Sequence, residues 1–305
     1  MFVKILLPRV ILTAQCVQRR LASSSDLRVQ SGASSTLTLL RSDGFEVYLK
    51  GTSHVSKKSE KAVRDVIDSV KPSVVMVELC DLRAQALRSR GPQRASFQMP
   101  FKDPFMQQMA DVFSELAFAN GRDMLAALEA ADATKARVMC GDLPQSVIMD
   151  RLKDSVTNYP GGIMGLMARA QMAPPPPPGL QSTLAQVQNF VMEAMRNGNM
   201  STSGQGGNAA AILGLAEQFK KRETLRQLRS WIGSVHPELV HALLGVRDEH
   251  LFESLRNLSR AVSSVKGSGQ RSVCVVGIAH MDGIEEMWAA EFGAASVQPI
   301  DHEEF

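Results

Sequence analysis

Cysteines, aromatic side chains and long apolar runs are all scarce in this 305-residue chain. The four cysteines include no close pair and no Cys-x-x-Cys spacing, which excludes a disulfide scaffold and a cysteine zinc finger and fits a reducing compartment. No run approaches the roughly 18 apolar residues of a membrane-crossing helix, so we expect a soluble or peripheral protein. Scattered basic residues and a net charge of +3 exclude the footprint of a nucleic-acid-binding protein.

The chain does carry enough apolar residues for one full core, at 44% hydrophobic content. Short apolar runs alternate with helical patterns, which indicates an α/β fold with a mainly parallel sheet flanked by helices. The expected strands cover about residues 37–41, 46–51, 73–78, 137–141 and 272–277. Helices are expected at about residues 56–69, 209–233, 237–264 and 281–288.

The first 31 residues differ from the domain expected at 32–305, because residues 1–25 contain four basic side chains and no acidic one. An Arg-rich, Ser-rich leader of this kind is typical of an organelle transit peptide, with the mitochondrion as the first choice. Lys4, Pro8 and Arg9 interrupt the apolar stretch, which argues against a secretory signal. A disordered tail, a plastid address and a cytoplasmic location are the alternatives.

A Pro-rich and Gly-rich insertion is expected at residues 172–208. Pro174 to Pro178 form a polyproline II spacer, and residues 197–208 are rich in Gly, Ser and Asn, so the two bracket a helix at about 183–196. The insertion is either a tolerated surface segment or a flap beside the sheet. The proline run also fits recognition by an SH3-like partner.

The sequence Gly-x-x-His occurs twice after an apolar run, at Gly51 to His54 and at Gly277 to His280. A third apolar run ends at Glu78, and a buried carboxylate is ordinarily paired or bound to a metal. Either Gly-x-x-His alone is common at strand ends, but ligands of open α/β sheets bind at the carboxyl ends of strands. His54, His280 and Glu78 are therefore candidate ligands of a divalent metal such as Mn, Co, Zn or Fe.

Taken together, these motifs resemble the TraB/PrgY/GumN/Tiki superfamily in its eukaryotic TraB-domain branch. The resemblance rests on Gly51-Thr-Ser-His-Val-Ser56, on Val77-Glu-Leu-Cys80 with Arg83, and on Gly277-Ile-Ala-His-Met-Asp-Gly-Ile284. It continues through residues 136–142, which end in Gly-Asp, and through an Arg-Asp segment at 245–249.

Two positions depart from the pattern of that superfamily. Its members often carry Arg after the Gly-Asp, where this chain has Leu143. They also tend to carry a Glu-aromatic pair where this chain has Asp123-Met124. If either altered group binds substrate, specificity or activity differs here.

The resemblance implies an erythromycin-esterase-like or ChaN-like fold and a metal-dependent hydrolase activity, with a peptide or small molecule as substrate. Glu78 then completes the metal shell or acts as the base, and Arg247 steadies an oxyanion or a substrate carboxylate. Asp142 is a reserve ligand or a partner of the ligands. Arg247 could instead pair with Asp248 or Glu249. The competing hypothesis is a non-catalytic scaffold or regulator at mitochondrial membranes.

Charged residues on the two long helices near the end of the chain are expected to face solvent, since charge at helical spacing is ordinarily on the surface. These arginines are Arg222, Arg226 and Arg229. The histidines outside the two motifs are expected to be solvated and not to bind metal; they are His236, His241, His250 and His302.

Overall fold

The structure is a computed structural model that describes residues 35–42, 44–52, 57–91, 121–196, 221–263 and 270–300. Several sequence predictions lie outside those residues: the leader at 1–31, the last part of the insertion at 197–208, and the residues His54 and His302.

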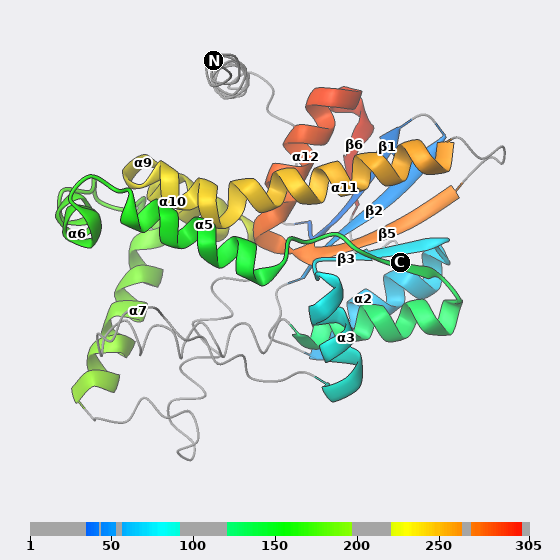
Figure 1. The fold of residues 1–305 in the computed structure, drawn as a ribbon, viewed down its shortest axis with the longest axis horizontal. Coiled ribbons are helices and arrows are strands. Elements are labelled where there is room, and N and C mark those ends of the chain that lie inside the picture. The colour runs from blue at the N-terminus through cyan, green and yellow to red at the C-terminus, as the bar shows by residue number, and fades with distance from the viewer. Residues whose placement is uncertain are drawn as a thin grey trace, which may run out of the picture.

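The described residues form one six-stranded sheet, with strand order β4-β3-β5-β2-β1-β6 (Figure 1). Strands β4, β3, β5 and β2 run parallel, whereas β1 is antiparallel to both β2 and β6. The α/β prediction is confirmed, and the sheet is mixed because β1 and β6 add an antiparallel edge. The strands are β1 (Leu37–Ser42), β2 (Phe45–Thr52), β3 (Val74–Val77), β4 (Arg137–Cys140), β5 (Gln270–Gly277) and β6 (Val297–Pro299), of which β6 was not predicted.

The strand that comes late in the chain, β5, lies between β2 and β3. Its residue Val275 pairs with Val77 of β3, and its last residue, Gly277, pairs with Thr52 of β2. The carboxyl ends of the three parallel strands therefore meet at one edge, as the sequence argument requires.

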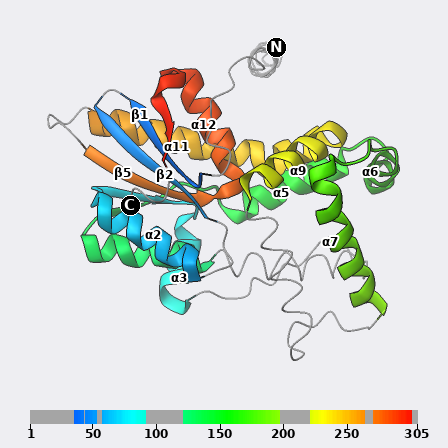
Figure 2. The same ribbon diagram turned by 180° about the vertical axis from the view of Figure 1, so that it is seen from behind.

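Helices cover both faces of the sheet because the strand side chains alternate. Val273 and Val275 of β5 face α2 (Lys57–Val70) and the helical residues 121–134, whereas Cys274 and Val276 face the opposite layer. That opposite layer contains α11 (Val246–Ser263) and α12 (Ile278–Phe292). Figures 1 and 2 show the two layers on opposite sides of the strands, with α3 (Asp81–Arg90) beside α2.

Trp288 anchors α12 to the sheet. It is fully buried, packs edge-to-face against Phe252 at a centroid distance of 6.4 Å, and donates its Nε1–H to the Arg41 carbonyl at 3.0 Å. Indole N–H groups are usually satisfied in this way when buried.

The described part of the chain between β4 and β5 is mostly helical, and Figure 1 shows four of its helices beyond the end of the sheet at which β5 leads into α12. They are α5 (Gln145–Thr157), α6 (Gly162–Gln171), α7 (Pro178–Arg196) and α9 (Arg222–Val235). Helix α7 starts at Pro178 rather than at 183, since the fixed φ of proline suits the first position of a helix. Within the described residues, no helix is long and apolar enough to cross a membrane.

The single helix expected at 237–264 is interrupted. Helix α10 (Pro237–Val240) is followed by a π-helical turn, η2 (His241–Gly245), and α11 begins after that turn. A Cβ on Gly245 would lie only 2.6 Å from His241 Nδ1, so glycine leaves room for that imidazole. Single π-turns are frequent beside functional sites, and this one directly precedes Arg247 and Asp248.

The buried face of α11 provides a test of the layered core. Leu255→Ala removes a fully buried side chain and should lower the free energy of unfolding by about 2–5 kcal/mol. Leu82→Ala, at a leucine that is 76% exposed, should change it by no more than about 0.5 kcal/mol. Urea unfolding of both variants measures the difference, and similar losses would contradict this assignment of the core.

Candidate functional site

Glu78 lies at the sheet edge, one residue beyond β3. Its backbone N–H donates to the Val275 carbonyl at 3.0 Å, which extends the pairing with β5. Its side-chain Oε2 accepts a hydrogen bond from the Gly277 N–H, at the point where β5 ends and α12 begins. The carboxylate is therefore held by the glycine of the second Gly-x-x-His motif.

His280 lies in the first turn of α12 and is 3% exposed. Its Nδ1 lies 2.5 Å from Asp248 Oδ1, and its Nε2 lies 3.4 Å from Glu78 Oε1. The imidazole is thus placed between two carboxylates that come from different layers of the fold.

Arg247 bridges Glu78 and a third carboxylate of the edge, Asp142. Its Nη2 contacts Glu78 Oε1, and its Nε and Nη2 lie 3.1 and 2.7 Å from the two oxygens of Asp142. The alternative pairing of Arg247 with its neighbours Asp248 or Glu249 is not what the structure shows: Asp248 faces His280 instead.

Asp142 is fully buried, and its contacts are already extensive. Besides Arg247, it accepts the Leu143 backbone N–H at 2.8 Å and lies 3.5 Å from Arg83 Nη1. A carboxylate bonded in this way positions Arg247 and is poorly available as a reserve metal ligand.

A close approach between α11 and α12 makes the contact of Asp248 with His280 possible. Gly283 lies one helical turn after His280, and a Cβ at that position would be 2.3 Å from Asp248 Oδ2. The other side of Asp248 is paired with Arg229, whose Nη2 is 2.8 Å from Oδ2.

Neighbouring charged groups set the protonation states of Glu78 and His280. Burial of Glu78 acts against ionisation, but His280 and Arg247 outweigh it, so the pKa of the carboxyl is well below its usual range. Burial likewise disfavours the charged form of His280, but Glu78 and Asp248 overcome it and raise the pKa of the imidazole to about 9.

The side chains described at this edge supply part of a metal-binding site. An imidazole whose Nδ1 is bonded to a carboxylate, with Nε2 directed at a second carboxylate, has the usual surroundings of a metal-binding histidine. His280 and Glu78 supply two donors, and no three His, Cys, Asp or Glu side chains among the described residues are placed so that they could hold a metal ion together. The predicted third ligand, His54, lies beyond the described end of β2, which stops at Thr52.

The three arginines Arg222, Arg226 and Arg229 were expected to face solvent. That prediction is wrong for Arg222, which is 2% exposed. It is incomplete for the other two: Arg226 binds an acidic residue of α12, and Arg229 binds one of α11. Buried carboxylates on the facing helices supply partners. His236 is also buried, edge-on to Tyr159 at 5.8 Å, so its predicted solvation is wrong.

Comparison with known proteins matches residues 36–290 to the TraB/PrgY/gumN family. The human TraB domain-containing protein is 23% identical over 290 residues, which cover 86% of this chain and 68% of the human protein. The mouse protein of the same name is 22% identical, with the same coverage. The bovine protein is 23% identical over 294 residues, which cover 86% of this chain and 67% of the bovine protein.

Gly283→Ala tests the approach of Asp248 to His280. The added methyl has no room beside Asp248, so the carboxylate should be pushed from the imidazole and stability should fall by about 1–3 kcal/mol. Gly233→Ala in α9 is the matched control, because its Cβ would meet nothing nearer than Val240 at 4.0 Å and alanine favours helix. Urea unfolding measures the loss of stability, and the NMR titration of His280 reports the displacement of the carboxylate from the imidazole. An equal loss of stability in Gly233→Ala would rule out the clash as the cause.

The raised pKa of His280 predicts a pH dependence of stability in the metal-free protein. The folded state holds the proton up to about pH 9, whereas an unfolded histidine releases it near pH 6.5. The contribution is therefore complete below about pH 6.5 and is lost as the pH rises through about 9. The stability difference between wild type and His280→Gln should shrink across this window by on the order of 1–3 kcal/mol. A difference that stays constant from pH 6 to 9.5 would contradict the shift.

Proposed function

Because the chain belongs to the TraB/PrgY/gumN family, we propose that the edge formed by Glu78, His280 and Asp248 is a metal-dependent hydrolytic site, with a peptide as the first substrate class to test. The observation that carries the proposal is the placement of a buried imidazole between two carboxylates at the carboxyl end of a parallel sheet. The erythromycin-esterase-like fold implied by the sequence resemblance belongs to the same proposal.

In this proposal His280 Nε2 and Glu78 hold a divalent ion together with His54, and Asp248 fixes the orientation of the imidazole. Such an ion, when bound, polarises a carbonyl and makes water acidic enough to act near neutral pH. The lowered pKa of Glu78 makes its carboxylate a weak base, which favours the role of ligand over that of proton acceptor.

Arg247 is proposed to stabilise negative charge that develops on the substrate. Its Nε and Nη2 are committed to Asp142 and Glu78, while Nη1 takes part in none of the hydrogen bonds found among the described residues. The same contacts fix the guanidinium in advance, which is the condition for stabilising an oxyanion without reorganisation.

A second candidate function is a non-catalytic scaffold or regulator. It is favoured by the ion pairs of Arg247, because they neutralise Glu78 and Asp142 internally and would also suit a purely structural role. For either function we keep a mitochondrial location as a proposal, on the basic, acid-poor composition of residues 1–25 alone.

Metal content distinguishes the two functions. Protein purified without chelator should contain close to one equivalent of a divalent metal by mass spectrometry, and the His54→Ala/His280→Ala double variant should lose it. Asp248→Asn should bind the metal about 10–100-fold more weakly, because the imidazole loses its orienting partner. His241→Ala, at an exposed histidine that has no hydrogen bond or ion pair with Glu78, Asp248 or His280 among the described residues, is the control and should retain full metal content.

Metal that is present in wild type and lost in the double variant would justify a peptide-hydrolysis screen. Absence of metal from wild type, even after reconstitution with Mn, Co and Zn, would overturn the hydrolase proposal. The scaffold alternative predicts that the double variant folds and still captures its partner.

A further inference from the structure

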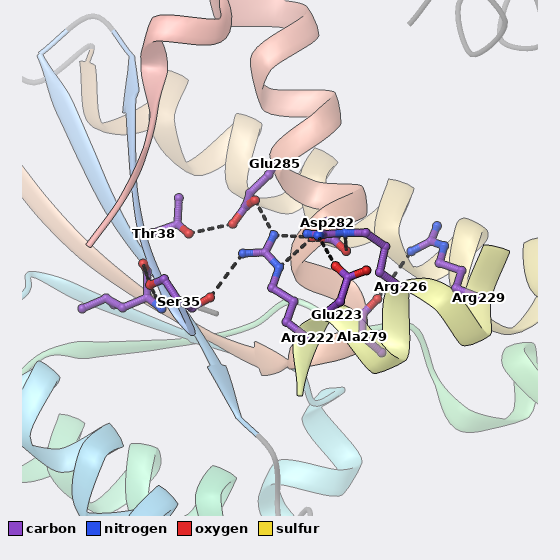
Figure 3. Close-up of polar contacts among 10 residues, drawn as sticks. Ser35, Thr38, Arg222, Glu223, Arg226, Arg229, Ala279, Asp282 and Glu285 are labelled. Atoms are coloured by element: carbon purple, nitrogen blue, oxygen red, sulfur yellow. Dashed lines mark hydrogen bonds and ion pairs between the residues drawn. The ribbon is translucent and has the colours of Figure 1, made fainter. Parts of the chain in front are cut away.

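Helix α9 presents three arginines toward the first turns of α12. Arg222, Arg226 and Arg229 occur at intervals of four and three residues, which places them on one helix face. Figure 3 shows their side chains directed at Asp282, Glu285 and the Ala279 carbonyl. All three acceptors lie within five residues of His280.

Arg222 makes the buried end of this contact. Its side chain is 1% exposed and pairs with both Asp282 and Glu285. Glu285 also accepts a hydrogen bond of 2.6 Å from Thr38 of β1, and Arg222 Nη1 donates to the Ser35 carbonyl at 3.3 Å. The guanidinium therefore ties α9 to α12 and to the edge of the sheet at once.

Arg226 adds a second contact to Asp282, at 3.0 Å from Nε to Oδ2 and 2.9 Å from Nη2 to Oδ1. It also pairs with Glu223 of its own helix.

Arg229 reaches the functional site itself. Its Nη2 is 2.8 Å from Asp248 Oδ2, and its Nη1 donates to the Ala279 carbonyl at 3.4 Å. Asp248 uses its other oxygen on His280 Nδ1. The chain of contacts thus runs from α9 through one carboxylate to the imidazole.

The outer side of α9 is held by the segment that precedes it. Trp231 Nε1 donates to the Pro174 carbonyl at 2.9 Å. At Gly179 of α7, a Cβ would lie 2.8 Å from Gln227 Oε1, so α7 and α9 approach closely. The Pro-rich segment and α7 are therefore in direct contact with the helix that braces the site.

We propose that docking of α9 regulates the site by setting the orientation of His280. Arg222 anchors the helix, and Arg229 transmits its position to the imidazole through Asp248, so that release of α9 leaves Asp248, the partner of His280, without the cation that pairs with its second oxygen. This inference rests on the proposed function in treating His280 as a metal ligand.

Arg229→Gln is the test, and Arg226→Gln is its matched control. Both remove one guanidinium from the same face of α9, and the two side chains are similarly exposed, at 29% and 35%. Arg229 pairs with Asp248, whereas Arg226 pairs with Asp282, which keeps its ion pair with Arg222 when Arg226 is lost. Arg229→Lys keeps a charge near Asp248 and tests for rescue.

Two measurements are made on the full chain: ¹⁵N NMR of the His280 ring nitrogens in metal-free protein, and affinity for Zn²⁺. Arg229→Gln should change the ring signals and weaken Zn²⁺ binding by about tenfold. Arg226→Gln should match wild type, and Arg229→Lys should restore most of the affinity and the ring signals.

The inference is overturned if Arg229→Gln leaves the ring signals unchanged, or if Arg226→Gln alters them equally. Should wild type bind no Zn²⁺, the proposed function fails, and the ring signals alone then decide whether α9 positions His280.

Discussion

A carboxylate at the end of a buried strand must be compensated, and the arrangement of this protein depends on how Glu78 meets that requirement. The compensation comes from three places that are distant in sequence: the Gly277 N–H, the Arg247 guanidinium and the His280 ring. Each also has a partner of its own, since Arg247 binds Asp142 and His280 binds Asp248. The polar edge is therefore one connected network, in which the loss of a member would leave another buried charge less fully compensated.

This network requires the whole sheet. Strand β5 lies between β2 and β3 although about 190 residues separate it from β3 in the chain, so Gly277 cannot reach Glu78 until the last parallel strand is inserted. Three glycines then permit close approach at the same end. Side chains at Gly51, Gly141 and Gly283 would meet Met281, Met76 and Asp248, respectively, at 2.1 to 2.3 Å. Glycine in the first Gly-x-x-His motif thus admits the α12 side chain that follows the second histidine.

The sequence predicts the edge well because strand ends are local features. Alternation and apolar runs locate five of the six described strands to within about two residues and miss β6, and parallel strands bring Glu78 and His280 together whatever the helices do. The partners of these residues were harder to foresee. Asp248 reaches His280 where Gly283 leaves space for its carboxylate, on a helix preceded by a π-helical turn, and neither feature has a periodicity that the sequence reveals. The third predicted ligand, His54, falls outside the described residues.

The arginines of α9 show why a pattern within one helix is ambiguous. Charges at helical spacing usually face water, and that argument placed Arg222 on the surface. The same spacing is equally suited to a facing helix that carries acids at a matching interval, as Asp282 and Glu285 do. A buried ion pair is weak support for stability, because desolvation cancels much of its attraction, but it strongly penalises any arrangement in which the charges separate. The pairing of Arg222 is thus better explained as fixing how α9 sits on α12 than as holding the fold together, and a fixed α9 is what an orienting contact from Arg229 requires.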